Sequence, residues 1–360
     1  MRSRVTCGVA GNDQLKSSCR CIDTQTSEAA HGPITKRRRK HMSSKASGTI
    51  LPASLLLLTY NHEGFVEAAA RACLNQDCEP IEIIFSDDAS TDATFEILSA
   101  LAAQYDGPHK LTLRRNTTNL GISAHYNRLV ALAMGDLLIT AAGDDISMPN
   151  RVGRLLETWR KNDRPPLVSS GFQAITLKGD LAGEPNLGSD LSRWKTADAW
   201  CKKRPRVVGA THAFTKKLWT VFGPLNEDIH YEDQVMSLRS CCLGGGINIP
   251  EALILYREGG VSSAEPRDRK HEDKIAALKT RFSRQRAVYA QVRTDLKTMR
   301  LEDLWLGKVR RYWERADTGL WVIAHRDELQ GHLYALFGHI RRSGLFWTLR
   351  LIYKVTCNTN

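Results

Sequence analysis

Two pairs of adjacent aspartates, Asp87-Asp88 and Asp144-Asp145, are the residues of this sequence best suited to chemistry. Each pair ends an apolar run of strand length, residues 83–86 in one case and 138–143 in the other, and turn residues follow. A buried parallel strand delivers polar groups to its carboxyl edge in this way. Because ligands of open α/β sheets bind at that edge, we expect both pairs to lie beside a ligand.

Neighbouring carboxylates at one strand end repel each other unless a positive charge lies close to them. A divalent metal ion that also binds a phosphate ester is the common source of that charge. The alternative is structural, since Asp87 or Asp92 could cap the following helix. We favour that alternative for Asp92, which closes the capping sequence Ser90-Thr91-Asp92, but not for Asp88 or for Asp144-Asp145.

The segments around these acids alternate between strand and helix. Alternation of this kind implies right-handed crossovers and an α/β fold, with a mostly parallel sheet and helices on both faces. Residues 178–206 are polar and interrupted by Gly and Pro, so we expect a mobile flap there. The strands are predicted at residues 54–58, 81–86, 111–114, 137–140, 167–175, 207–214 and 247–256, and the helices at 63–75, 93–104, 124–134 and 152–161.

Charge divides the chain into three predicted parts. The formal net charge of +12 comes from +7 in residues 1–49, −5 in residues 50–266 and +10 in residues 267–360. The first part is rich in Ser, Thr, Lys and Arg and is predicted to be a disordered basic tail. The middle part holds the α/β domain, and the last part is predicted to be a basic helical extension. Charge confined to such ends favours a solvated surface or anionic lipid over nucleic acid.

The cysteines and the apolar segments indicate a location. The nine cysteines are scattered without paired CxxC motifs, which is typical of neither a disulfide framework nor a zinc site and fits a reducing compartment. We find no signal peptide and no apolar stretch of spanning length. We therefore expect a cytoplasmic protein. Residues 344–355 mix aromatic, aliphatic and basic residues, which suits either a helix on the inner face of the membrane or a cap on the α/β domain.

Beyond the acid pairs, successive motifs resemble one known family. Residues 54–61, 82–92, 119–127 and 135–151 look like the ordered blocks of family 2 glycosyltransferases of the GT-A fold. Tyr231-Glu232-Asp233 with Arg239, and Tyr256-Arg257 with the segment 259–262, are similar to the late motifs of that family. The resemblance extends over residues 53–263. The sequence departs from the family at Leu58, where proline is usual, and at Ala142, where many members have the first Asp of the DxD motif.

The resemblance implies a role for each matching residue. Thr59 and Tyr60 correspond to the segment that lines the nucleotide base, and Asp88 to the acid that hydrogen-bonds the base. Asp144 corresponds to the ribose contact and Asp145 to the metal ligand of the DxD-type motif. The resemblance also assigns the general base to Asp233 and a diphosphate contact to Arg257. It implies Mg²⁺ or Mn²⁺ as the cofactor.

The implied reaction is sugar transfer from a nucleotide-diphosphate donor, with a UDP- or dTDP-sugar expected. The metal ion would neutralise the departing diphosphate, and a carboxylate base would take the proton of the acceptor. One base without a second nucleophile predicts a single displacement with inversion. The expected acceptor is a saccharide or a lipid-linked sugar used to build cell-surface polysaccharide or glycolipid.

Other interpretations of the sequence remain open. A nucleotidyltransferase could use a similar sheet, although the segment 59–64 lacks the Gly-rich basic loop typical of that class. A non-catalytic protein could use its basic ends to bind nucleic acid or a membrane. Asp233 could also be an exposed helix acid that pairs with Arg239. We assign no role to His62, His125, His212 or His230.

Overall fold

The computed structural model describes residues 51–259, 271–326 and 333–356. The basic tail predicted over residues 1–49, the domain boundary predicted near residue 266 and most of the glycine-containing motif at 259–262 lie outside the described residues. The three-part domain division therefore stays a prediction.

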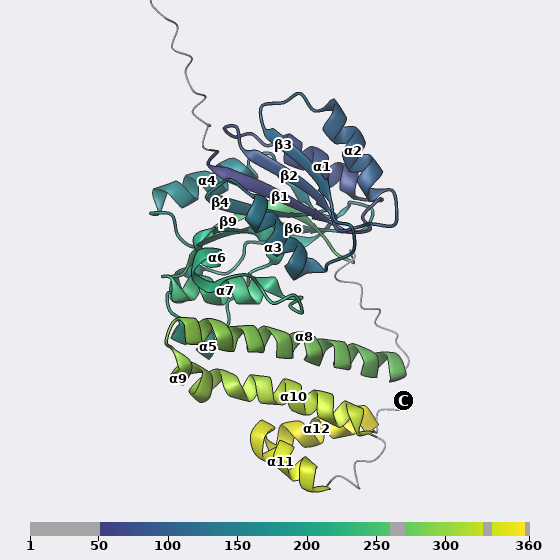
Figure 1. Ribbon diagram of the computed structural model, residues 1–360, viewed down its shortest axis with the longest axis vertical. Coiled ribbons are helices and arrows are strands. Elements are labelled where there is room, and N and C mark those ends of the chain that lie inside the picture. The colour runs from purple at the N-terminus through teal and green to yellow at the C-terminus, as the bar shows by residue number, and fades with distance from the viewer. Residues whose placement is uncertain (1–50, 260–270, 327–332, 357–360) are drawn as a thin grey trace, which may run out of the picture. The chain divides into compact units, whose positions relative to one another are not determined.

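One nine-stranded sheet forms within the described part of the chain (Figure 1). Its strands are β1 Ala53–Thr59, β2 Glu82–Asp87, β3 Lys110–Arg115, β4 Leu137–Ala142, β5 Ile146–Ser147, β6 Leu167–Ile175, β7 Leu181–Asn186, β8 His212–Thr215 and β9 Gly246–Arg257. They follow the order β3-β2-β1-β4-β8-β6-β9-β5, and β7 pairs with β6. Strands β3, β2, β1 and β4 are parallel, as are β6 and β9, and the remaining pairings are antiparallel.

Helices connect the strands and cover both faces of the sheet. In the first half of the chain they are α1 Val66–Leu74, α2 Thr94–Gln104, α3 Ile122–Leu132 and α4 Arg151–Lys161. The second half of the α/β region contains η1 Leu191–Arg193, α5 Ala197–Lys202, η2 Gly209–Thr211, α6 Lys217–Phe222 and α7 Glu232–Cys242. The fold class and the helices on both faces are as the sequence predicts.

Strand β1 shows why its leucines run without interruption. Leu55 and Leu57 join the hydrophobic cluster that includes α1, α2 and α4. Leu56 and Leu58 join the opposite cluster, which includes α3, α6 and Met236 of α7. Successive side chains of a strand point to opposite faces. A central parallel strand covered on both sides is therefore apolar throughout, rather than alternating.

The order of the first four strands places a topological switch point, the expected crevice for a ligand, between β1 and β4. From β1 the chain moves outward through β2 to β3, and then returns to place β4 on the other side of β1. The chain after β1 and the chain after β4 both lead to helices on the same face, α1 and α4, whereas α3 covers the other face. In open α/β sheets, such a switch point at the carboxyl edge is where ligands bind. The predicted acids lie in the loops on either side of it.

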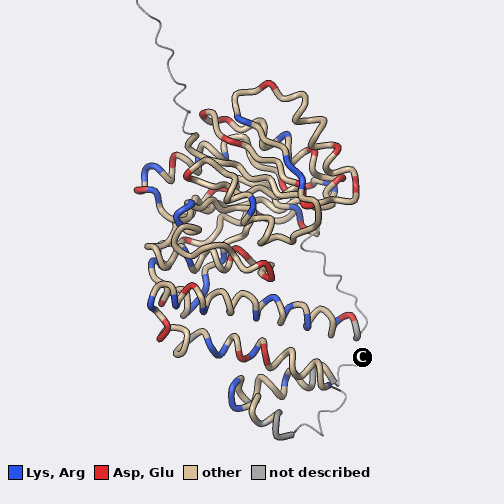
Figure 2. The backbone as a smooth tube through the Cα atoms, viewed as in Figure 1, with Lys and Arg blue, Asp and Glu red and all other residues tan. Residues whose placement is uncertain are grey.

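After residue 270 the described chain is helical. It contains α8 His271–Thr298, α9 Glu302–Leu304, the π-helical turn η3 Trp305–Val309, α10 Arg310–Ala324, α11 Leu333–Ser343 and α12 Leu345–Thr356. Lys and Arg positions, blue on the backbone tube of Figure 2, outnumber the red acidic positions along α8. Among the described helices, none combines the length and the apolar character needed to cross a bilayer.

The helices after residue 270 share a core with the α/β region. Val288, Val292 and Leu296 of α8 are buried in one hydrophobic cluster with Val235 and Leu238 of α7. A second cluster joins α8 and α10 to α12. The first of these clusters is continuous across the predicted domain boundary, so α8 supports the α/β region directly.

Two predicted segments differ from the structure. Part of the predicted flap is buried: Trp200 is 1% exposed, and its Nε1 donates to Ser237 Oγ of α7 at 2.9 Å. Residues 181–186 of the same segment form β7, which the sequence did not predict. The strand predicted at 207–214 begins only at His212, because residues 209–211 form a helical turn. The side chain of Trp200 is buried against apolar residues of α7 and α8, which are far along the chain and which the polar composition of the segment does not reveal.

Candidate active site

The carboxyl ends of β2, β1 and β4 bring both aspartate pairs to one edge of the sheet. Thr59 lies in register with Asp87, and Leu58 lies in register with the last residue of β4. Beyond the strands, Asp88 N donates to Thr59 O at 2.9 Å and Gly143 N donates to Leu58 O at 3.0 Å. Because adjacent strands lie about 4.8 Å apart, the two loops flank the end of β1 at roughly 10 Å from each other.

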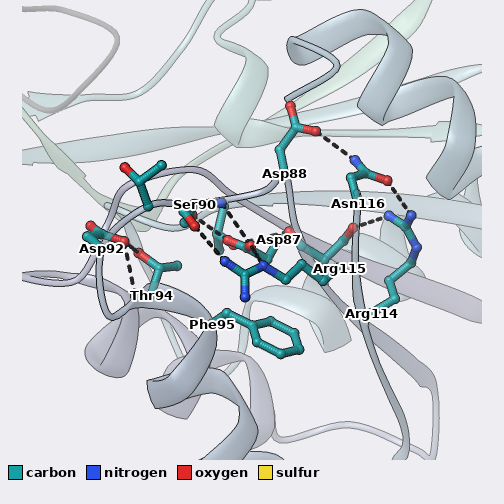
Figure 3. Close-up of polar contacts among 12 residues, drawn as sticks. Asp87, Asp88, Ser90, Asp92, Thr94, Phe95, Arg114, Arg115 and Asn116 are labelled. Atoms are coloured by element: carbon teal, nitrogen blue, oxygen red, sulfur yellow. Dashed lines mark hydrogen bonds and ion pairs between the residues drawn. The ribbon is translucent and has the colours of Figure 1, made fainter. Parts of the chain in front are cut away.

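Asp87 is a buried anchor (Figure 3). Its Oδ2 accepts from Ser90 N at 3.0 Å and lies 3.2 Å from Nε of Arg115, while Ser90 Oγ donates to its Oδ1. The Arg115 guanidinium lies over the ring of Phe95 in α2, 4.8 Å from its centroid. These contacts satisfy Asp87 inside the protein and fix the loop that follows β2.

Asp88 holds the segment between β3 and α3. Its Oδ1 accepts from Asn116 Nδ2 at 2.6 Å and from Leu120 N at 3.0 Å, and its Oδ2 accepts from Gly121 N at 3.0 Å. Asn116 in turn accepts from Arg114, as Figure 3 shows. Gly121 has a φ of 77°, which glycine adopts easily, and precedes α3. Asp88 therefore orders this loop, and its contact with a nucleotide base stays a prediction.

The structural role predicted for Asp92 is confirmed. Asp92 Oδ1 accepts from Thr94 N at 3.0 Å and from Thr94 Oγ1 at 2.6 Å at the start of α2. Its Oδ2 accepts from Glu63 N at 3.0 Å. Hydrogen bonding from Thr94 and Glu63 lowers the pKa of Asp92 despite the opposing effect of burial. Asp92 lies one residue before the N-cap Ala93, accepts from the first backbone N–H of α2 and ties the loops after β1 and β2 together.

His62 packs against the second aspartate pair, although the sequence gave no reason to select it. Its Nδ1 accepts from Tyr60 N at 3.3 Å, and its Nε2 lies 3.9 Å from Asp144 Oδ2. Burial lowers the pKa of His62, so the ring is neutral and carries its proton on Nε2, facing Asp144. A Cβ at Gly143 would approach His62 Nδ1 to 2.5 Å, which explains the glycine before the aspartates.

Arg257 encloses Asp145 from the last strand of the sheet. Asp145 Oδ1 accepts from Arg257 N at 2.9 Å, and Arg257 Nε donates to Asp144 O at 3.0 Å. The guanidinium also donates to Thr176 O and Leu177 O, and it lies 4.7 Å from the ring centroid of Phe65. Arg257 therefore braces the acidic loop, and a contact with the diphosphate of a donor stays a prediction.

Burial and repulsion leave the second aspartate pair short of positive charge. Burial, and after it the neighbouring charge of Asp144, raise the pKa of Asp145 to about 7. Arg257 and Arg151 lower it only in part. Arg151 is fully buried and donates to Ser147 Oγ, Thr140 O and Ala210 O at 2.7–2.8 Å. The loop is rigidly held, yet a further cation beside Asp144 and Asp145 would relieve their repulsion.

The donor chemistry of this loop fits the predicted metal ion. Carboxylate oxygens are the ligands that Mg²⁺ and Mn²⁺ prefer. Within the described ranges, no group of three or more His, Cys, Asp or Glu side chains is arranged to hold a metal ion. The protein would therefore supply one or two carboxylates, from Asp145 and Asp144. Mg²⁺ commonly takes its remaining ligands from substrate phosphates and water.

The first turn of α7 carries the other acidic pair. Burial, and then the charge of Asp233, raise the pKa of Glu232 to about 8, while burial raises the pKa of Asp233 to about 6. Glu232 Oε1 lies against Gly209, whereas the charge of Arg204 lowers the pKa of Asp233. Within the pair, the shift in pKa is larger for Glu232 than for Asp233, so Asp233 is the member that ionises first, as a general base must.

Asp233 does not pair with Arg239, so that alternative is wrong. Arg239 is fully buried and pairs with Asp295 of α8, with Nε and Oδ2 2.8 Å apart. It also donates to Gly223 O at 2.9 Å. Arg239 thus joins α7 to α8, the helix that follows the α/β region, and is not available to Asp233.

Tyr256 links the two acidic regions. The pKa of Tyr256 is raised by burial and, in decreasing order, by the charges of Asp145, Asp144 and Asp233. These carboxylates therefore lie within electrostatic reach of one phenol at the end of β9. Asp144, Asp145 and Arg257 contact one another, whereas the placement of Asp233 beside them as the base stays a prediction.

The sequence of the first half of this site matches a known family. Residues 54–171 fit the family model described as glycosyl transferase family 2. This segment belongs to glycosyltransferase family 2. The glycosyltransferase domain includes the aspartate pairs, and the matched residues end at Gly171 of β6, before the part of the chain that carries Asp233.

Curated relatives and solved structures agree with this family. The chain is 31% identical over 119 residues to EpsE of Bacillus subtilis, named as a glycosyltransferase, covering 33% of this chain and 42% of that protein. It is 25% identical over 227 residues to an uncharacterised glycosyltransferase of Haemophilus influenzae, covering 58% and 65%. The chain thus spans less than two thirds of the length of each.

A solved structure supports the fold. TarS 1–349 of S. aureus, in complex with UDP-GlcNAc, superposes with a TM-score of 0.51 at 15% identity, over 84% of this chain and 90% of that chain. The GT-A fold that the sequence predicts is confirmed. The superposition covers more of the chain than the family match, so it includes part of the chain outside residues 54–171.

Sequence reasoning missed three residues that build the site. His62 fixes Asp144, Arg151 lies buried behind Asp145, and Glu232 keeps a proton beside Asp233. Arg151 and Glu232 lie inside the quoted motifs, which was a usable signal. His62 directly follows the motif at residues 54–61. Only the structure shows that its ring packs against Gly143 and lies beside Asp144.

Proposed function

We propose that the chain is a metal-dependent, inverting glycosyltransferase that uses a nucleotide-diphosphate sugar. The observation that carries the proposal is the family 2 match over residues 54–171, combined with two aspartate pairs on either side of the sheet's switch point. The neighbour TarS is described with UDP-GlcNAc, which favours a uridine nucleotide among the expected donors. These comparisons disfavour a nucleotidyltransferase or a non-catalytic basic protein.

In the proposed mechanism, the donor nucleotide lies against the ends of β1 and β2, next to Thr59, Tyr60 and Asp88. Asp144 orients the ribose, while Asp145 holds the divalent ion. When bound, this ion supplies positive charge to the leaving diphosphate. Arg257 and Arg151 keep the carboxylate of Asp145 in place, so that no rearrangement is needed when the donor binds.

The acceptor reacts from the α7 side of the crevice. Asp233 accepts the proton of the acceptor hydroxyl as that oxygen attacks the anomeric carbon of the donor sugar. The bond from this carbon to the diphosphate oxygen breaks in the same displacement, which inverts the anomeric configuration. Glu232 remains protonated beside Asp233, because two adjacent, half-buried carboxylates do not both ionise easily. A saccharide or lipid-linked acceptor in cell-surface polysaccharide or glycolipid synthesis fits this chemistry.

A peripheral position on the cytoplasmic face of a membrane also belongs to the proposal. Phe346 of α12 is 84% exposed and Leu349 is 50% exposed, and the exposed Arg341, Arg342 and Arg350 lie nearby in the sequence. Apolar side chains among arginines suit a helix that lies on anionic lipid. Phe346→Asp should reduce co-sedimentation with anionic vesicles, and equal sedimentation of both proteins would argue against membrane binding.

The deciding experiment is calorimetry of nucleoside diphosphates with and without Mn²⁺, on the wild-type chain and on Asp145→Asn. We expect one nucleoside class, UDP or dTDP, to bind tightly only with the metal ion. The substitution should weaken that binding at least ~100-fold, because a charged ligand of a divalent ion is lost. Asp136→Asn, at an exposed site, is the matched control. Binding that needs neither Mn²⁺ nor Asp145 would refute the site.

A further inference from the structure

A small basic pocket lies beside the helix that carries Asp233. Its walls are Trp200, the run Lys202-Lys203-Arg204 after α5, Tyr289 of α8 and Tyr312 of α10. The cavity has a volume of about 70 Å³. Tyr289 and Tyr312 stack with ring centroids 5.8 Å apart, and Trp200 is almost fully buried. The pocket therefore has rigid aromatic walls and a cationic rim.

Two contacts fasten this pocket to the first turns of α7. Arg204 Nη1 donates to Gln234 Oε1, next to Asp233, and Trp200 Nε1 donates to Ser237 Oγ at 2.9 Å. The charge of Arg204 also lowers the pKa of Asp233. A group bound in the pocket would consequently lie close to the proposed base, on the side of the crevice where the acceptor enters.

Of the three basic side chains on the rim, one forms an ion pair with a carboxylate in the described part of the chain. Lys202 pairs with Asp198, with Nζ and Oδ2 2.7 Å apart. Among the residues that the structure describes, no ion pair is formed by Lys203 or by Arg204. The Arg204 guanidinium instead lies over the rings of Tyr289 and Trp200, 5.6 Å and 6.0 Å from their centroids. Arginine stacked on an aromatic wall keeps donors for an anion.

The cavity has room for an anionic group. One water needs roughly 10–15 Å³ of space open to water-sized spheres, so a cavity of about 70 Å³ can hold a phosphate or carboxylate group. The basic side chains on the rim favour an oxyanion in this space.

We infer that this pocket is an acceptor subsite that binds an oxyanion, the phosphate or the carboxylate of an acidic acceptor. That the bound molecule is an acceptor rests on the proposed glycosyltransferase function, whereas binding of an anion in the pocket can be tested separately. An acidic group held by Lys203 and Arg204 would place a neighbouring hydroxyl of the same acceptor toward Asp233. Neutral acceptors would lack this contact.

The experiment measures anion binding without turnover. Inorganic phosphate and glucuronate are titrated by calorimetry into the full chain carrying Asp145→Asn, which disables the metal-dependent donor site. We expect one of the two to bind, and the one that binds identifies phosphate or carboxylate as the source. The additional change Lys203→Gln with Arg204→Gln should weaken that binding about tenfold or more, since charge-assisted hydrogen bonds are lost.

Two controls keep the result specific. Lys217→Gln removes one exposed positive charge from α6 and should leave anion binding unchanged. Arg204→Lys, with Lys203 unchanged, retains the positive charge. This variant should bind the anion more tightly than the Lys203→Gln, Arg204→Gln double variant. Absence of binding for both anions, or equal binding by the double variant, overturns the inference. Failure of nucleotide binding in the earlier calorimetry would instead overturn the proposed function, and the two results are independent.

Discussion

The two sides of the crevice are built in different ways. On the donor side, Asp88, Asp144 and Asp145 come directly after strands and are fixed by loops that contact neighbouring strands. On the acceptor side, Asp233 begins a helix whose position depends on distant segments, through Arg239 with Asp295 and Trp200 with Ser237. The donor side is set by sheet geometry, and the acceptor side by packing between helices.

This difference suggests how the activity could vary between related chains. Strand ends in a parallel sheet occupy fixed places, so a common nucleotide-diphosphate site can be kept with little change. A helix supported from α5 and α8 can be shifted by altering those supports. We expect donor and metal binding to depend on the first region, and acceptor choice on the second.

The sharpest test of this comparison separates chemistry from donor binding. Asp233→Asn should lower kcat by about 10²–10⁴, the usual contribution of a general base, while leaving metal-dependent nucleotide affinity unchanged. Glu232→Gln should cost less than about tenfold, because Glu232 is already protonated at neutral pH, with a pKa near 8. Steady-state kinetics alongside calorimetry provide both quantities. If the two variants lost activity equally, Asp233 would not be the base.

The next test addresses the support of α7 from beyond residue 270. Asp295→Asn leaves the fully buried Arg239 without its partner, which should lower the free energy of unfolding by about 3–5 kcal/mol. Asp317→Asn is the control, because its ion pair with Arg286 is half exposed and should contribute about 0–1 kcal/mol. Urea denaturation measures both. A small effect at Asp295 would mean that the acceptor side does not depend on α8.

The smallest expected effect concerns pH and the donor side. The folded state raises the pKa of Asp145 from 3.8 to about 7, and so favours its protonated form. The stability that this group contributes is therefore fully present below about pH 4 and is lost as the pH rises to about 7. Asp145→Asn should be more stable than wild type by about 1–3 kcal/mol at pH 8, with no difference near pH 4.

Thermal and urea unfolding at several pH values measure this trend, and Asp136→Asn serves as the exposed control. A constant difference between Asp145→Asn and wild type at every pH would show that the Asp145 carboxylate is not strained in the folded chain. Addition of Mn²⁺ with the nucleotide should remove the penalty in wild type only, because the bound cation stabilises the ionised carboxylate.

Much of the donor side could be predicted from the sequence. Apolar runs at residues 54–58 and 137–140, each followed by polar turns, predict strands, and the strand ends predict which edge carries Asp88 and Asp145. The polar segment around Trp200 was misinterpreted as a flap, because its burial depends on Val235 and Leu238 far along the chain. Local patterns do not contain such partners.

By itself, the sequence determined the α/β class, the GT-A resemblance and the acids that end β2 and β4. These features depend on period and order, which are properties of neighbouring residues in the chain. Only the tertiary structure decided that His62 faces Asp144, that Arg239 pairs with Asp295, and that Arg204 joins two aromatic side chains beside Asp233. Burial and charge pairing between segments far apart are set by packing, and no local pattern encodes them.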